Sequence, residues 1–412
     1  MLYQAVDAQL LSLAPARMVA RYWQHMLTNP MMPASYTTAG RATAAMCEIF
    51  DRTTKRHRKP SFGLHHTVIG GEEVAVKETV VLHKPFCNLL NFHRDLPAKA
   101  AQPQLQPKVL VVAPMSGHYA TLLRGTVETL LPDNDVYVTD WADARLVPLS
   151  QGGFDLADYI DYVLDFIRHL GAETHVIAVC QPSPPVLSAV ALMASFNDPM
   201  QPRSVTLMGG PIDTRVNPTE VNELSANYPL DWFERTMVHT VPLWHPGALR
   251  RVYPGFLQLG SFVSMNPDRH VGSHLEFFQN LVKGDGESAD THRRFYDEYL
   301  SVMDLSADFY LDTVRHVFQE HSLAEGKFRH RGVLVEPAAI QRTGLMTIEG
   351  ELDDISGAGQ TRVAHDLCRN LAADKKVHHL QKNVGHYGIF NGRRWRQEIY
   401  PRWREFVLAQ GG

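Results

Sequence analysis

The stretch Thr174-His-Val-Ile-Ala-Val-Cys180-Gln-Pro-Ser-Pro-Pro-Val-Leu187 joins a short apolar run to a helical pattern at a cysteine. The run is too short for a helix and rich in branched side chains, so it predicts a buried strand that ends at Cys180. A nucleophilic side chain in a sharp strand-to-helix turn is typical of a nucleophile elbow, where free N–H groups of the first helical turn favour a thiolate. Pro184 and Pro185 also restrict the residues before them, so we expect regular helix only from about Val186.

Apolar runs of this kind recur along the chain and alternate with helical patterns. Such strands, separated by helices, predict an α/β fold with a mostly parallel central sheet covered on both faces. Because ligands bind at the carboxyl ends of parallel strands, the residues that follow each strand are candidates for a site. We expect strands at 74–82, 108–113, 135–139, 174–180, 204–208, 344–348 and 376–380, and helices at 119–131, 156–170, 186–195, 361–371 and 397–408.

One connection is much longer than the others. The 135 residues of 209–343 separate two expected strands, against roughly 30 residues for an ordinary strand–helix–strand unit. This stretch has its own helical patterns, at 273–282 and 292–320, and many large aromatic residues, so we expect an inserted, mainly helical cap. The predicted parts of the chain are an N-terminal helical region packed on the core (1–70), the first part of the core (71–208), the cap (209–343) and the second part of the core (344–412).

The N-terminal segment predicts an amphipathic helix that is broken near Pro15. We expect its apolar stripe to pack into the core, and docking onto a hydrophobic particle is the alternative. The segment has no basic region before its apolar residues, so it does not predict a secretory signal, and no run of 18 apolar residues predicts a membrane span. The stripe consists of Leu10, Leu11, Ala14, Met18, Tyr22 and Met26.

The composition excludes several classes of protein. The 412 residues are 44% hydrophobic and 20% charged, which excludes a disordered chain or a charged coiled coil. A net charge of −4 makes nucleic-acid binding through bulk charge unfavourable. The motifs of metal and phosphate sites are missing, so we expect no metal. The cysteines are too widely spaced for a zinc ribbon or a dense disulfide framework and suit the reducing cytoplasm; they are Cys47, Cys87, Cys180 and Cys368.

A base and an orienting acid for Cys180 follow later expected strands. Asp353 lies shortly after the strand at 344–348, with Asp354 as a rival beside it. His386 follows the strand at 376–380 and comes directly after a glycine. Nucleophile, acid and histidine in this chain order are the arrangement of α/β-hydrolases, so we predict a Cys180–His386–Asp353 triad.

Backbone N–H groups near the elbow are candidates for an oxyanion hole. The N–H of Gln181 lies at the start of the helix after the nucleophile, and the loop after the strand at 108–113 usually supplies a second donor. Met115 is the first candidate in that loop and Ser116 the second. Further candidates for the walls of the substrate pocket are Ser116, His118, Trp141, Asp354 and Tyr387.

With these residues the chain resembles the intracellular poly(3-hydroxybutyrate) (PHB) depolymerases, which are similar in fold to the polyhydroxyalkanoate synthases. The Cys-Gln-Pro turn at Cys180 is the most specific match. The resemblance implies an α/β-hydrolase fold, a cysteine nucleophile with Asp353 and His386 as partners, and cytoplasmic polyester granules as the substrate. The matching stretches are Met1-Leu-Tyr-Gln, 40–50, 111–124, Val179-Cys-Gln-Pro182, 345–360 and 383–391.

We therefore expect a depolymerase that cleaves PHB or related polyesters through a thioester acyl-enzyme. Water or coenzyme A (CoA) would release the acyl group, and the sequence calls for no other cofactor. The alternatives are a synthase-like acyltransferase with the same triad, a non-catalytic granule-binding protein, and a hydrolase of small esters or lipids. We expect no nucleic-acid partner and no membrane span, and the oligomeric state stays open, a homo-oligomer included.

Overall fold

A nine-stranded sheet forms the centre of the computed structural model, which describes residues 2–96, 106–265 and 267–411. Its order is β1-β2-β3-β5-β4-β6-β7-β13-β14. The first three strands pair antiparallel, and the six from β5 to β14 pair parallel. The strands are β1 (His66–Ile69), β2 (Glu72–Lys84), β3 (Cys87–Arg94), β4 (Lys108–Val112), β5 (Asp135–Trp141), β6 (Thr174–Val179), β7 (Ser204–Met208), β13 (Gly344–Gly350) and β14 (Lys376–Gln381).

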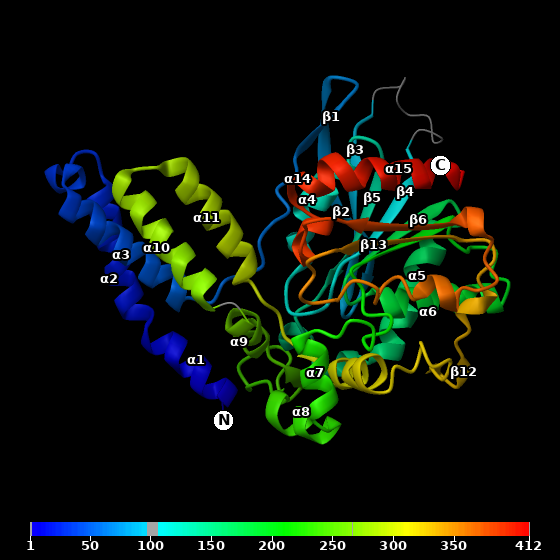
Figure 1. Ribbon diagram of the computed structural model, residues 1–412. Helices are drawn as coiled ribbons and strands as arrows, with labels where there is room; N and C mark the ends of the chain where they lie inside the picture. The colour runs from blue at the N-terminus through cyan, green and yellow to red at the C-terminus, as the bar shows by residue number, and fades with distance from the viewer. Residues whose placement is uncertain (1, 97–105, 266, 412) are drawn as a thin grey trace.

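Helices cover both faces of this sheet. Figure 1 shows α5 (Leu156–Leu170) and α6 (Ser183–Ser195) on one side and α4 (Arg124–Leu130) and α15 (Tyr400–Ala409) on the other. The central strands β4, β6, β7 and β13 are almost entirely buried, as their apolar runs require. Antiparallel strands that lead into a parallel sheet, with the elbow after β6 at its centre, make this the α/β-hydrolase fold expected from the sequence.

Two helices differ from the sequence-based expectation. Helix α6 begins at Ser183, before Val186, with Pro184 and Pro185 in its first turn. Proline fits there because the N–H groups of a first turn have no partner within the helix. The helix expected at 361–371 shrinks to α13 (Ala364–Leu367), because the Glu349 carboxylate binds backbone N–H groups just before it.

The connection between β7 and β13 holds most of the remaining helices and a small sheet of β8 (His239–Thr240), β9 (Arg251–Tyr253) and β10 (Leu305–Ser306). The helix expected at 292–320 is interrupted where β10 pairs with β9. The helices are α7 (Glu220–Asn227), α8 (Leu230–Met237), α9 (Gly255–Met265), α10 (Pro267–Lys283), α11 (Gly286–Tyr299), α12 (Ala307–Thr313) and the π-helix Val314–Gln319.

The N-terminal helices α1 (Leu2–Ser12), α2 (Ala14–Thr28) and α3 (Thr38–Thr54) join this connection. Helix α3 packs on α2 and α10, and Figure 1 shows α2, α3, α10 and α11 as a helical lobe beside the sheet. The N-terminal region thus packs mainly on helices of the long connection. The predicted division of the chain into four parts stays a prediction.

The apolar stripe of α1 and α2 does not enter the core. Leu11 is 70% exposed, Met18 71% and Tyr22 60%, so the expectation of core packing is wrong. Small residues bring α2 and α3 together instead, among them the buried Ala20 and Ala44. Helices that meet through small side chains leave their bulky residues on the outside.

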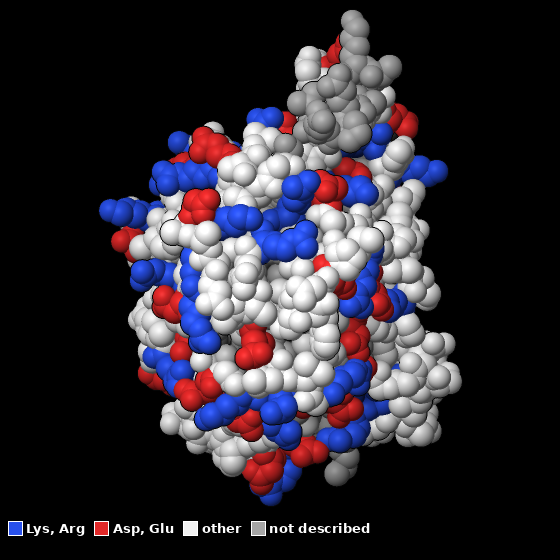
Figure 2. Space-filling view, turned by 90° about the vertical axis from the view of Figure 1, so that its right-hand side faces the viewer, with Lys and Arg blue, Asp and Glu red and all other residues white. Residues whose placement is uncertain are grey.

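Surface charge is mixed on the face that Figure 2 shows, where Lys and Arg are interspersed with Asp and Glu. This pattern agrees with the small net charge of −4. Nucleic-acid binding proteins usually present a continuous basic stripe, and this face has none. No helix in the described part of the chain is both long and apolar enough to cross a bilayer.

A buried polar cluster joins the N-terminus, the core and the long connection. The Tyr3 hydroxyl donates to Asp304 Oδ2 at 2.6 Å, and the N–H of Gly255 donates to Asp304 Oδ1 at 2.9 Å. The N–H of Asp304 donates to Asp143 Oδ1 at 3.1 Å, and Arg145 pairs with Asp143 at 2.6 Å. Burial, followed by the charge of Asp143, raises the pKa of Asp304 to about 6.

Tyr3→Phe should lower the stability of the protein measurably. The change removes a donor from a buried carboxyl group, and an unsatisfied buried acceptor costs about 1–3 kcal/mol. The midpoint of thermal unfolding, followed by circular dichroism, tests this. Tyr36→Phe is the matched control, because the Tyr36 hydroxyl binds the Pro30 carbonyl at an exposed site. Equal midpoints for the two variants would contradict the anchoring role of Tyr3.

Candidate active site

Cys180 occupies a strained turn between β6 and α6. Its φ of 66° lies in the left-handed region, which a residue with a Cβ rarely adopts. The N–H of Cys180 donates to the Met208 carbonyl at 2.7 Å, and the N–H of Ser183 donates to the Cys180 carbonyl at 3.0 Å, which closes the turn. This geometry is the nucleophile elbow expected from the sequence, and strain of this kind concentrates at functional sites.

Two glycines after β7 make room for the elbow. A Cβ at Gly210 would lie 2.0 Å from Ser183 Oγ and 3.0 Å from the Cys180 carbonyl oxygen. A Cβ at Gly209, whose φ is 56°, would lie 3.2 Å from both Asp353 Oδ2 and His386 Cε1. No larger residue fits at either position without a shift. The sequence analysis missed this pair, although its place directly after a buried strand was a usable signal.

His386 and Asp353 meet beside the elbow. The Nδ1 atom of His386 lies 2.7 Å from Asp353 Oδ2, and both residues are buried. The other carboxylate oxygen of Asp353 accepts from the N–H groups of Ile355 at 2.9 Å and Ser356 at 2.8 Å. Asp354 points to solvent. The structure therefore places Asp353, and not its rival, against the histidine.

Cys180 completes the cluster through its interaction with His386. Burial alone would lower the pKa of His386, but the charges of Cys180 and Asp353 and hydrogen bonds with both raise it well above its ordinary value. A protonated imidazole between a carboxylate and a thiol stabilises the thiolate form of the thiol. The three residues selected from their order in the sequence thus lie together in the fold.

The other three cysteines lie in less reactive surroundings. Burial raises the pKa of Cys47, raises the pKa of Cys368 to about 12, and raises that of Cys87 well above its ordinary value. All of them are free thiols. Because the thiolate is the reactive form, these residues are poor nucleophiles at neutral pH.

Met115 and Gln181, which carry the expected oxyanion donors, are in contact, and this contact occupies the donor of Met115. The N–H of Met115, just after β4, donates to the side-chain oxygen of Gln181 at 3.2 Å. Gln181 itself is almost buried. A carbonyl oxygen of the protein thus occupies the Met115 donor, so a substrate oxygen can use it only after the Gln181 side chain moves.

An apolar cavity of about 480 Å³ opens at Cys180 and His386. The core contributes Met115, Ser116, His118, Gln181 and Tyr387, as the sequence predicted. Apolar and aromatic residues of the long connection form much of the remaining wall, and the sequence analysis did not identify them as such; they include Val221, Leu224, Tyr253, Phe309, Tyr310 and Phe318. A cavity of this size and character suits a largely apolar small ligand or a chain segment.

The structure corrects two predicted pocket residues and defines a third. Trp141 lies in the core, where it stacks on Tyr159 with ring centroids 4.3 Å apart and donates to the Ala113 carbonyl at 2.9 Å. Asp354 is exposed and does not line the cavity. His118 lines it, and burial lowers the pKa of its imidazole to about 4, so the ring is neutral at pH 7.

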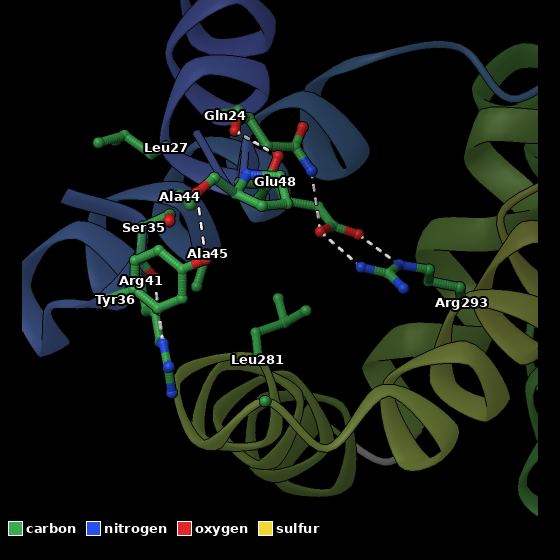
Figure 3. Close-up of a pocket in the computed structure, with 13 residues that line it drawn as sticks. Gln24, Leu27, Ser35, Tyr36, Arg41, Ala44, Ala45, Glu48, Leu281 and Arg293 are labelled. Atoms are coloured by element: carbon green, nitrogen blue, oxygen red, sulfur yellow. Dashed lines mark hydrogen bonds and ion pairs between the residues drawn. The ribbon is translucent and has the colours of Figure 1, made fainter. Parts of the chain in front are cut away.

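A second cavity, of about 490 Å³, lies in the helical lobe between α2, α3 and α10 (Figure 3). Glu48 accepts there from Gln24 Nε2 at 2.9 Å and from Arg293 Nε at 2.6 Å. Among the described residues that line this cavity there is no cysteine and no histidine. Its main polar groups bind one another, and its lining offers no thiol and no histidine to act as a base, so it is not the candidate active site.

Hydrogen bonds tie the loop that carries Asp353 both to the sheet and to helix α7. Glu349 accepts from the N–H groups of Gly359 at 2.9 Å and Thr361 at 2.8 Å. Gln360, fully buried, donates through Nε2 to Asn222 Oδ1 at 2.8 Å. Asn222 lies on α7, which also lines the cavity. Sequence reasoning missed these polar residues, because nothing in their local pattern separates them from ordinary loop residues.

Comparison with protein-family models gives one match to this chain. Residues 209–410 match the family described as PHB de-polymerase C-terminus. The C-terminal part of the chain thus matches the PHB depolymerase family, which the resemblance had predicted. The matched region contains Asp353 and His386 and starts directly after β7. Comparison with curated proteins gave no match.

Solved structures similar to this chain include three hydrolases. Monoacylglycerol lipase from Paleococcus ferrophilus is 14% identical, with a TM-score of 0.44 over 74% of this chain and 96% of that one. A thermophilic esterase from Thermogutta terrifontis is 12% identical, with a TM-score of 0.41 over 84% and 98%. The hydrolase BphD from Rhodococcus sp. strain RHA1 is 15% identical, with a TM-score of 0.42 over 82% and 100%. Similarity at this level carries no argument on activity.

Iodoacetamide should modify Cys180 before the other thiols at pH 7, because Cys180 lines the cavity beside His386 whereas burial raises the pKa values of the other three thiols. Asp353→Asn should slow this reaction by about tenfold. The change removes the charge of the carboxylate that binds His386, and a hydrogen bond to a charged group is worth about 1.5–3 kcal/mol. Peptide mapping by mass spectrometry over time gives the rate for each cysteine. Equal rates for Cys180 and Cys47 would contradict the proposed pairing with His386.

Asn222→Leu should slow the same alkylation by about fivefold, the factor that corresponds to about 1 kcal/mol of lost hydrogen bonding. The change removes the oxygen that accepts from Gln360 and from the N–H of Thr219. Asn222→Asp is the matched control. It keeps that oxygen at the third position of α7, where a helix start favours an acid, so its rate should stay near that of the parent protein. A parent-like rate for Asn222→Leu would show that the link to α7 does not position Asp353.

Proposed function

We propose that this protein hydrolyses the ester bonds of PHB or of its oligomers, with Cys180 as nucleophile. The observation that carries the proposal is the buried His386 between Cys180 and Asp353 at an apolar cavity. The match of residues 209–410 to the PHB depolymerase family supports a polyester substrate. A polyester of short hydroxy acids is largely apolar, and the cavity walls suit such a chain.

In the proposed reaction the Cys180 thiolate attacks a backbone ester carbonyl of the polymer. The N–H of Gln181 and that of Met115 stabilise the oxyanion that forms. His386, held by Asp353, protonates the departing alkoxide, and a thioester on Cys180 remains. The now neutral His386 then takes a proton from water, and the hydroxide attacks the thioester. The hydroxy acid leaves, and the Cys180 thiolate beside protonated His386 is restored.

The Gln181 side chain has a role of its own in this proposal. Its oxygen accepts from the N–H of Met115 before substrate binds. A substrate carbonyl that enters the hole takes over that donor, and the carboxamide turns away. The exchange replaces one hydrogen bond to a neutral oxygen by another, and the bond strengthens only when charge develops on the substrate oxygen. Such a difference between ground state and transition state is what accelerates a reaction.

CoA is an alternative acceptor for the acyl group. Its thiol would attack the thioester on Cys180, and a hydroxyacyl-CoA would leave. The polymer would be reached at the surface of cytoplasmic polyester granules. A thiol nucleophile suits such a reducing compartment, because oxidation would inactivate it.

Cys180→Ala should abolish the release of hydroxy acid from amorphous PHB while the far-ultraviolet circular dichroism stays unchanged. Cys180→Ser should keep little activity, because a hydroxyl group is a far weaker nucleophile beside the same histidine. Cys47→Ala is the matched control and should retain the parent rate. A Cys180→Ala variant that still degrades the polymer at the parent rate would refute the proposal.

Product analysis with and without CoA distinguishes the acceptors. Free 3-hydroxybutyrate or its oligomers without CoA indicate hydrolysis, whereas a hydroxyacyl-CoA that forms only with CoA indicates thiolysis. Polymer growth from 3-hydroxybutyryl-CoA would instead assign the triad to synthesis. Cleavage of short p-nitrophenyl esters without any action on the polymer would assign it to a small-ester hydrolase.

A further inference from the structure

Helices α1 and α2 carry a wide apolar face on the outside of the molecule. Leu11, Met18 and Tyr22 follow one another at intervals of seven and four residues, which places them on one side of a helix. The spacing holds across the junction of α1 and α2, because Leu13 keeps helical dihedrals, φ −81° and ψ −9°. We name as the outer apolar face these three residues with Val19 and Trp23, which are between 51% and 71% exposed.

The fold does not use this face. The opposite side of α2 packs on α3, and Ala20 is buried there. On that side Arg21 pairs with Asp51 at 2.7 Å, and Arg17 donates to the Thr54 carbonyl at 2.9 Å. Figure 1 shows α1 and α2 along the outer edge of the helical lobe. Single exposed apolar residues are ordinary, but a contiguous face with two aromatic rings marks an interaction surface.

The charge around this face is one-sided. Residues 8–47 contain no aspartate and no glutamate, whereas they contain Arg17, Arg21 and Arg41. Arg17 and Arg21 turn toward α3, so the face itself combines apolar groups with the hydrogen-bond donors of the Tyr22 hydroxyl and the Trp23 indole, and residues 8–47 supply it with no carboxylate. A polyester surface is its chemical complement, since it exposes alkyl groups and carbonyl oxygens, which only accept hydrogen bonds.

We propose that the outer apolar face docks the protein onto the surface of a water-insoluble polyester particle. This inference rests on the proposed function, and it adds the surface that brings the enzyme to its substrate. Helices α1 and α2 together span about 40 Å, long enough to lie along such a surface. The lobe also connects to the active site, because α9, which precedes α10, contributes Ser261 and Ser264 to the walls of the apolar cavity.

Sedimentation with particles of amorphous PHB tests the proposal. The test variant carries Met18→Gln, Tyr22→Gln and Trp23→Gln. The matched control carries Val68→Gln, Val80→Gln and Phe196→Gln, three comparably exposed apolar residues outside the helical lobe. The test variant should bind the particles at least about tenfold more weakly than the parent protein, because it loses apolar contact at three positions. The control variant should bind like the parent protein.

Hydrolysis of p-nitrophenyl butyrate, a soluble ester, separates docking from catalysis. Both variants should keep the parent rate on this ester, while the test variant degrades particles more slowly at low particle concentration. Parent-like particle binding by the test variant overturns the proposal. So does a parent dimer in size-exclusion chromatography with light scattering that the test variant converts to a monomer, since the face would then join two copies. Strong particle binding by a parent protein that cleaves no ester would refute the proposed function and leave the docking inference standing.

Discussion

The candidate site depends on one backbone constraint, the left-handed conformation of Cys180. A residue with a Cβ holds this conformation only where its surroundings enforce it. Two hydrogen bonds of the turn, from Cys180 to Met208 and from Ser183 to Cys180, provide part of that enforcement. The prolines after the turn also favour the folded state, because their fixed φ leaves the unfolded chain fewer conformations to lose on folding. Gly209 and Gly210, directly after β7, leave the space that the turn needs.

The loop that carries Asp353 connects the elbow to helix α7 of the long connection. Asp353 orients His386, and its own loop is held by Glu349 from the core and by Asn222 from α7. Since α7 also lines the apolar cavity, the wall that contacts a ligand and the loop that orients the base share one set of hydrogen bonds. Hydrogen bonds between buried groups hold the loop of Asp353 in one arrangement.

The sequence predicted those parts of the fold that arise from local pattern. Apolar runs located the parallel strands, and the chain order of nucleophile, acid and histidine located Cys180, Asp353 and His386. Long-range contacts decided the parts that could not be predicted. Trp141 follows a strand as a pocket residue would, yet its ring stacks in the core. The helix expected at 361–371 is shortened where backbone N–H groups donate to the Glu349 carboxylate. The stripe of α2 faces outward because alanines fill the helix contact.

In the absence of substrate, the hydrogen bond from the Met115 N–H to the Gln181 side chain occupies one donor of the expected oxyanion hole. On the proposed mechanism, a ligand competes at this donor with a group of the same chain, whose effective concentration is far above that of any solute. A molecule that only fills the apolar cavity leaves the contact intact, whereas a carbonyl compound must open it. The apparent affinity for such a compound is lowered by the fraction of molecules in which the contact is closed. The oxyanion hole would then discriminate between ligands that merely fit and ligands that can react.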